Sequence, residues 1–243
     1  SNYDESFVGA NLVIGQRAIT ITADAKSKYC GQADPLLTAK ITSGSIVTGD
    51  LAGGSLSRQA ANTVGTYSIN KNTYTFGSNY AETFVGANFN IVSVTLDITN
   101  AQNPRSISED VIIKIGVSAG GTLVSDAVIT LNVVGFGIRQ STSIAGVATF
   151  NLGKLSSELY AVTAKAGGCS ESETVFLPVY DPNGGFVTGG GWIESPAGAS
   201  KLFPLATGKA NFGFNAKYKT GKNNTTEVDG NTNFQFKAGD LHF

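Results

Sequence analysis

The side chains that could carry chemistry are few and widely spaced along the sequence. His242 is the only histidine among the 243 residues, and Cys30 and Cys169 lie 139 positions apart. A catalytic triad, a reactive thiol or a zinc centre needs further ligands or a general base beside such a residue. We therefore predict no catalytic residues and a solvent-exposed His242. We expect Cys30 and Cys169 to be isolated from each other, or paired with a module outside this sequence, with a disulfide between them as the less favoured alternative.

Three consecutive glycines, Gly189 to Gly191, suggest a phosphate-binding loop at first sight. Such loops lead into the N-terminus of a helix and usually carry a lysine. Trp192 and Pro196 follow here instead, and no helical periodicity is present. We predict a β-turn or a close backbone approach under Trp192.

Many carboxylates lie near predicted turns. They are Asp24, Asp34, Asp50, Asp97, Asp110, Asp126, Asp181, Asp229 and Asp240. Turn capping is the favoured interpretation, because Ca²⁺ takes six to eight oxygen ligands and the sequence has no dense D-x-D-x-D-G loop. The alternative is a Ca²⁺ site, for which Asp97 and Asp181 are the first candidates; we predict no other cofactor. The sequence does not decide whether two of these carboxylates form a catalytic pair for glycoside hydrolysis.

Trp192, Phe203 and Tyr218 are the candidates for ligand binding. Together, the three aromatic rings could form a platform on which a sugar stacks. Packing of the same rings into a core is the favoured interpretation. The ligand of the alternative would be a host or environmental glycan.

The composition is typical of an all-β protein with many turns. The chain has 30 glycines, 41% apolar residues and only 14% charged residues. A formal net charge of −1 with no basic block argues against a nucleic-acid partner. No long apolar segment is present, so we predict no membrane insertion.

A long internal repeat reveals the organisation of the chain. SNYDESFVGANLVI begins at Ser1 and SNYAETFVGANFNI begins at Ser78, with ten identities in fourteen positions. A spacing near 80 residues fits one small β-sandwich per repeat. We interpret residues 1–15 as the final strand of a preceding repeat and residues 16–94 as the first complete module.

Residues 16–94 resemble the MBG family, a group of mostly bacterial immunoglobulin-like repeats. The resemblance is carried by residues 28–38 (KYCGQADPLLT), Ser43 to Ser45, residues 54–58 (GSLSR) and residues 64–67 (VGTY). In the commonest form of this family's motif the glycine comes one residue earlier, so Cys30 is an extra residue before Gly31. Alternating segments such as AITITADAK, LLTAKITSGSIV and TVGTYSI predict its strands.

Residues 95–182 predict a second immunoglobulin-like β-sandwich. Six strands are expected in SVTLDIT, DVIIKIGVS, DAVITLNVVG, AGVATFNLG, LYAVTAKAG and ETVFLPVYD. GKLSSELYAV is similar to a tyrosine corner, in which the hydroxyl of Tyr160 would bond to upstream backbone. The module is similar to bacterial immunoglobulin-like or PKD-type domains.

Residues 183–243 resemble the post-COAP domain of secreted bacterial proteins, through the phrases Phe186 to Trp192 and Gly208 to Tyr218. That family's domain continues further, so we expect this last module to be incomplete and to expose a strand edge.

The sequence as a whole predicts tandem immunoglobulin-like β-sandwiches from an extracellular or cell-surface bacterial protein. The expected role is a non-catalytic spacer, such as an adhesin stalk, whose partners are the neighbouring modules and a host or environmental protein or glycan. The alternative is a carbohydrate-binding or accessory module of a secreted enzyme.

Overall fold

The computed structural model describes residues 2–182, 186–220 and 226–242, without the side chains of residues 186, 217–220 and 226–228. Ser1 at the start of the repeat, residue 183 at the start of the predicted third module, and Phe243 lie outside this range. The prediction of an all-β fold is confirmed. By its contacts the chain forms two compact units. The first comprises Ser1–Ser27, Pro35–Ala61 and Thr66–Asn90, and the second comprises Lys28–Asp34, Asn62–Gly65 and Ile91–Phe243.

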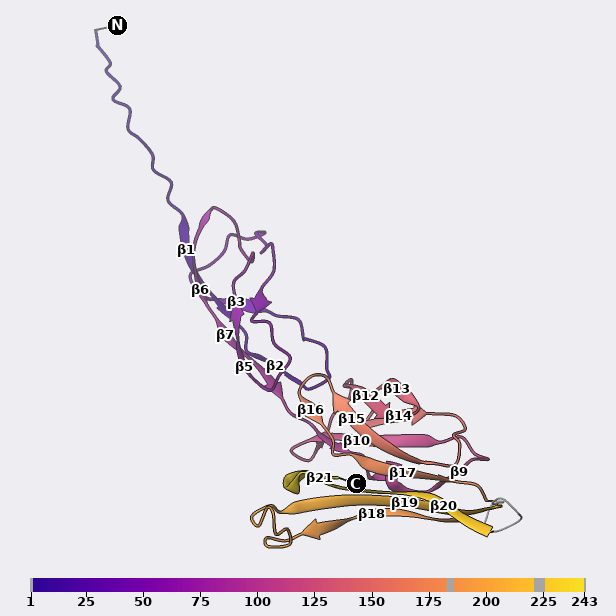
Figure 1. The fold of residues 1–243 in the computed structure, drawn as a ribbon. Helices are drawn as coiled ribbons and strands as arrows, with labels where there is room; N and C mark the ends of the chain where they lie inside the picture. The colour runs from indigo at the N-terminus through magenta and orange to yellow at the C-terminus, as the bar shows by residue number, and fades with distance from the viewer. Residues whose placement is uncertain (1, 183–185, 221–225, 243) are drawn as a thin grey trace. The chain divides into compact units, whose positions relative to one another are not determined.

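The first seven strands form two sheets, ordered β3-β1-β6 and β2-β7-β5-β4 (Figure 1). They are β1 (Arg17–Ala23), β2 (Lys26–Tyr29), β3 (Ala39–Ser43), β4 (Ser57–Arg58), β5 (Gly65–Asn70), β6 (Tyr80–Val85) and β7 (Ala87–Val92). In β1 the alternation of Ile19 and Ile21 with threonines places both isoleucines in the core, where they pack with Tyr80. The strands predicted from AITITADAK, LLTAKITSGSIV and TVGTYSI are therefore confirmed as β1, β3 and β5.

The repeated stretch at Ser78 forms two strands, although the sequence predicted one. β6 pairs in parallel with β1, with Arg17 opposite Tyr80, while β7 lies between β2 and β5 in the other sheet. The change of sheet occurs at Gly86. A Cβ atom there would lie 2.8 Å from the carbonyl oxygen of Ile69, so only glycine allows this close approach.

The second unit contains a sandwich of two sheets. One has the order β11-β10-β14 with β8 also on β10, and the other has the order β13-β12-β15-β17-β9 with β16 also on β15. The strands are β8 (Thr95–Asp97), β9 (Arg105–Ser106), β10 (Ile112–Ala119), β11 (Thr122–Leu123), β12 (Val128–Val133), β13 (Gly137–Thr142), β14 (Val147–Asn151), β15 (Leu159–Ala166), β16 (Ser170–Glu171) and β17 (Val175–Tyr180). A short 3-10 helix, η1 (Thr99–Gln102), follows β8. All six strands expected between residues 93 and 181 are present.

Strict alternation builds the core of this sandwich. Ile129, Leu131 and Val133 on β12 are completely buried, and the alternate residues of β10 and β15 are buried as well. The predicted tyrosine corner is confirmed, because the hydroxyl of Tyr160 donates to the carbonyl oxygen of Ser156 at 3.2 Å.

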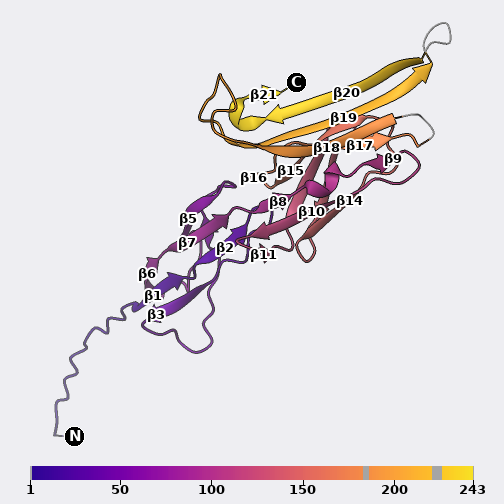
Figure 2. The same ribbon diagram turned by 90° about the horizontal axis from the view of Figure 1, so that it is seen from below.

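The C-terminal strands form one antiparallel sheet, ordered β18-β19-β20-β21 (Figure 2). They are β18 (Phe186–Ser195), β19 (Gly208–Thr220), β20 (Thr226–Phe236) and β21 (Leu241–His242), with a 3-10 helix, η3 (Lys237–Gly239), before β21. β18 and β19 pack against β17 of the sandwich. His242 is exposed, as the sequence predicted.

Small and polar residues form the face of this sheet that contacts the sandwich. A Cβ at Gly213 would lie 2.5 Å from the Cβ of Phe176, and the buried Asn215 donates to the carbonyl oxygen of Val179 at 3.2 Å. Phe214 lies on the opposite face, over Gly189, where a Cβ would be 2.9 Å from the ring. The three glycines therefore lie within a strand at a close approach, and the alternative prediction of a β-turn is wrong.

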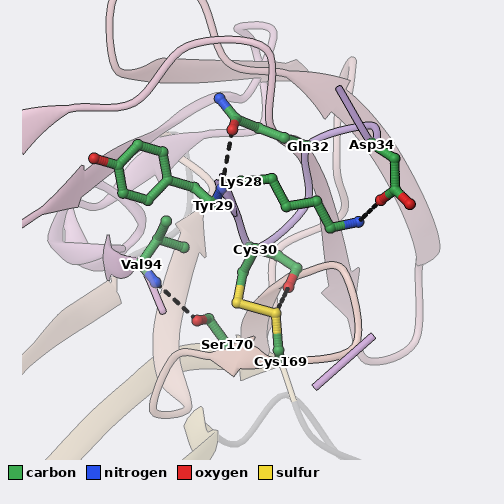
Figure 3. Close-up of a disulfide and its surroundings, with 9 residues drawn as sticks. Lys28, Tyr29, Cys30, Gln32, Asp34, Val94, Cys169 and Ser170 are labelled. Atoms are coloured by element: carbon green, nitrogen blue, oxygen red, sulfur yellow. Dashed lines mark hydrogen bonds and ion pairs between the residues drawn. A yellow bond between two sulfur atoms is a disulfide. The ribbon is translucent and has the colours of Figure 1, made fainter. Parts of the chain in front are cut away.

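Cys30 and Cys169 form a disulfide, so the expectation that they are isolated is wrong (Figure 3). The prediction counted Cys30 with the first module, but Lys28–Asp34 belongs by its contacts to the same compact unit as Cys169. Hydrogen bonds surround the bridge: Cys30 N donates to Val92 O at 2.9 Å, and Val94 N donates to Ser170 Oγ at 3.0 Å. Lys28 forms an ion pair with Asp34 at 2.7 Å.

The described residues include no helix of the length and apolarity that crossing a membrane would require.

Candidate ligand-binding groove at Trp192

Trp192 lies on the inner face of the C-terminal sheet, near one end of β18. Its register partner on β19 is Asn211, and the Lys209 ammonium lies 4.5 Å from the centre of the indole ring. The indole keeps 48% of its surface exposed. An aromatic side chain this accessible beside polar groups is suited to contact a ligand.

Two cavities adjoin Trp192, both within the second unit. One, of about 410 Å³, is lined by Leu96, Ile98 and Val175 at its apolar wall. Its polar wall consists of Asp97, Thr99, Gln102, Glu173, Lys209 and Asn211. The other, of about 720 Å³, lies between Asn100 to Pro104 and the glycines of β18. Because Trp192, Thr99 and Gln102 line both, we treat the two cavities as one groove and call it the Trp192 groove.

The hydrogen bonds within the groove fix its polar groups in place. Asp97 Oδ1 accepts from Thr99 N at 3.0 Å and from Thr99 Oγ1 at 2.7 Å. These bonds hold the pKa of Asp97 below its usual value, because they stabilise the carboxylate. Asn211 donates to Glu173 Oε2 at 3.2 Å, and Gln102 donates to the carbonyl oxygen of Gly191 at 3.5 Å.

This arrangement has the features of a ligand-binding site. Its volume lies in the usual range of ligand sites, and it combines one aromatic surface with amide, carboxylate and ammonium groups.

The structure does not bring the three predicted aromatic residues together. Phe203 lies in the loop between β18 and β19, is 44% exposed and does not line the groove. The backbone of Tyr218 lies seven residues beyond Asn211 on β19, which corresponds to about 23 Å. The side chain of Tyr218 lies outside the described residues.

The structure places the two candidate calcium ligands, Asp97 and Asp181, at the ends of strands β8 and β17. Asp97 caps the turn that leads into η1, which confirms turn capping for this residue. Asp181 follows β17 and is half-buried. Within the described ranges, no three His, Cys, Asp or Glu side chains gather closely enough to hold a metal ion.

Sequence reasoning identified Trp192 but missed the polar residues around it. Asn211 and Lys209 follow from the pairing of β18 with β19, because residues opposite or diagonal to Trp192 share its face. This relation can be used only when the register between β18 and β19 is known. Gln102 comes from η1, and no local pattern connects it to Trp192.

Comparison with known proteins finds a similarity for one segment of the chain. Residues 19–90 match the MBG domain (YGX type) family model. This supports the MBG-type repeat predicted for the first module. A comparison with curated proteins gives no match.

Proposed function

We propose that this chain is a non-catalytic spacer region of a large extracellular or cell-surface bacterial protein, such as the stalk of an adhesin. The observation that carries the proposal is the MBG match at residues 19–90, together with the copy of its closing strands at the N-terminus. Modules that each have their own core can follow one another in tandem without affecting each other's folding. Their contribution to the protein is then the length that they add.

Two further features support this proposal. The Cys30–Cys169 disulfide suits an oxidising compartment outside the cytosol. The low content of charged residues keeps electrostatic repulsion along an extended array small.

Replacement of this region in the parent protein tests the spacer role. Residues 17–242 would be exchanged for two unrelated β-sandwiches of similar combined length, and a deletion would serve as the matched control. A spacer predicts that the replacement keeps the parent's activity at the cell surface while the deletion reduces it. Loss of activity in the replacement as well as in the deletion would contradict the proposal.

The Trp192 groove supports a second candidate function, binding of a carbohydrate. A sugar ring would lie against the exposed indole, and the carboxylate, amide and ammonium groups of the groove would bind its hydroxyl groups. The ligand class rests on the pairing of one aromatic surface with many hydrogen-bonding groups.

Affinity electrophoresis and a glycan array, with the full chain, test this second function. Trp192→Ala should abolish binding. Ile193→Ala is the matched control, because Ile193 is 52% exposed and lies on the other face of the same strand. Equal binding by all three proteins, or none by the wild type, would rule the groove out as a glycan site. A hydrolase panel on the same protein should give no turnover.

A further inference from the structure

The disulfide between Cys30 and Cys169 closes a covalent loop that spans 139 positions of the sequence. Cys30 directly follows β2, and Cys169 directly precedes β16. The strands from β3 to β15 therefore lie inside the loop, whereas β1, β2 and the strands from β16 onward lie outside it. The buried residues of β10, β12 and β15, which form the core of the sandwich, are all inside.

Two glycines allow the ends of this loop to meet. Gly31 follows Cys30 with a φ of +87°, and a Cβ there would lie 2.9 Å from the carbonyl oxygen of Val128. Gly167 precedes Cys169 by two residues with a φ of +55°, and a Cβ there would lie 2.9 Å from the backbone nitrogen of Gly31. Both the left-handed backbone and the lack of space favour glycine at these two positions. The chain is therefore built for a close approach at the bridge.

Hydrogen bonds hold the segment Lys28–Asp34 in place around the bridge (Figure 3). The carbonyl oxygen of Gly31 accepts from Val128 N at 3.0 Å, and Gln32 Nε2 donates to the carbonyl oxygen of Ser125 at 2.7 Å. By its contacts this segment belongs to the same compact unit as the other end of the bridge. Each such bond contributes only about 0.5–1.5 kcal/mol, so under load the covalent bond is the contact that lasts.

Tension that acts across the loop follows the covalent chain. It runs along the backbone to Cys30, crosses the S–S bond and continues from Cys169. The backbone of residues 31–168 is not in series with this path, so tension does not stretch it. This holds even when β1 is pulled away from β3 and β6, because β1 lies outside the loop.

The same chain without the bridge responds differently to tension. Its whole backbone is then in series, and continued pulling extends the strands from β3 to β15 as well. A separation of 139 residues corresponds to about 460–500 Å of fully extended chain. In the bridged chain, the 5.8 Å between the two Cα atoms takes the place of that length.

We propose that the Cys30–Cys169 disulfide is a covalent bypass for tension, which keeps residues 31–168 out of the load path when the chain is pulled. This function rests on the proposed spacer role, in which the region transmits load along a surface protein. The bypass limits how far the region lengthens under load, and it spares the core of the sandwich from forced extension.

The bridge can be opened from the side of Cys169. Cys30 is completely buried, whereas Cys169 is half-buried and lines two cavities of about 510 Å³ and 210 Å³ within the second unit. A thiolate of a small dithiol that attacks Cys169 Sγ breaks the S–S bond, and Cys30 leaves as a thiolate. The second thiol of the reagent then displaces Cys169, so the reagent becomes a cyclic disulfide and both cysteines are reduced. Reduction therefore removes the bypass.

Single-molecule stretching of residues 1–243 between two marker domains of known length tests the proposal. Without a reductant, we expect complete unfolding to release only the length of the residues outside the loop. Dithiothreitol added to molecules held under load should then release about 460–500 Å more. The comparison is made within one molecule, so it does not require that a variant fold.

Cys30→Ser with Cys169→Ser is the matched control. This double variant should release the full length without a reductant and should not respond to dithiothreitol. The proposal is overturned if the wild type releases the full length without a reductant, or if dithiothreitol adds no length.

The stretching experiment needs no parent protein, so its result is separate from the test of the spacer role. A length gain on reduction, together with a failed replacement in the parent, would leave the bypass as a property of the chain and reject the load-bearing role. No length gain, together with a successful replacement, would reject the bypass alone.

Discussion

The two compact units achieve stability by different means. In the second unit, buried apolar residues recur at alternate positions of β10, β12 and β15 and form an apolar core. The first unit buries a smaller cluster around Ile19, Ile21 and Tyr80 and supplements it with partly buried hydrogen bonds. Glu82, whose side chain is only 5% exposed, is the clearest case. An apolar core has no groups that titrate, whereas a carboxylate that is buried and paired makes stability depend on pH.

The largest expected effect comes from the core of the second unit. Leu131→Ala removes a completely buried side chain from β12 and should lower the free energy of unfolding by about 2–5 kcal/mol. Ile138→Ala on the exposed strand β13 is the control and should cost less than about 0.5 kcal/mol. Denaturant unfolding measures both. Equal effects would mean that the core is not where the structure puts it.

The disulfide should have the next largest effect. Cys30→Ala with Cys169→Ala, or reduction of the wild type, should cost about 2–4 kcal/mol, because the bridge restricts the unfolded chain. The double variant should then be insensitive to reductant. Thiol alkylation followed by mass spectrometry checks the bond itself. Two reactive thiols in the unreduced, unfolded protein would contradict it.

Glu82 should make the first unit sensitive to acid. Burial alone would raise the pKa of Glu82, but the Lys71 ion pair and the bonds from Phe76 N and Thr75 Oγ1 hold it below the usual 4.5. The stability that this shift contributes is therefore complete above about pH 4.5 and is lost as the pH falls through the lowered value.

Glu82→Gln should cost about 1.5–3 kcal/mol at neutral pH and should flatten this acid dependence. Glu5→Gln is a matched control, because Glu5 is the repeated counterpart of Glu82 and is exposed. Hydrogen exchange of the Ile19 and Ile21 amides, followed against pH, reports on the first unit alone. A Glu82→Gln profile that runs parallel to the wild-type profile would refute this role.

The smallest effect is expected at the tyrosine corner of the second unit. Tyr160→Phe keeps the buried ring and removes only the hydroxyl that bonds to Ser156, so we expect a loss of about 0.5–1.5 kcal/mol. Tyr3→Phe, at an exposed tyrosine, should have no measurable effect. Chemical denaturation of the two variants separates these outcomes.

Strand prediction succeeded where side chains alternate and missed elements where they do not. β13 was not among the predicted strands, because GIRQST is an exposed edge segment without a buried face. The division of the repeated stretch into β6 and β7 was missed for another reason. Its pattern continues across Gly86, and only the packing of Gly86 against Ile69 shows where the chain changes sheets.

The candidate site was predictable only in part. Trp192 is identifiable as the only tryptophan, and its neighbours Lys209 and Asn211 are fixed by strand register. Gln102 and Glu173 reach the groove from other elements. Their proximity depends on how the C-terminal sheet lies on β17, which no local pattern encodes.

The sequence by itself determined the all-β class, most strands, the tyrosine corner and the repeat, because alternation and turn chemistry are local properties of the chain. Only the tertiary structure decided that Cys30 meets Cys169, that the repeated strand pair divides between two sheets, and that Trp192 borders a groove. These features join residues far apart in sequence. The packing of whole sheets brings such residues together, and their spacing along the sequence does not predict which of them will meet.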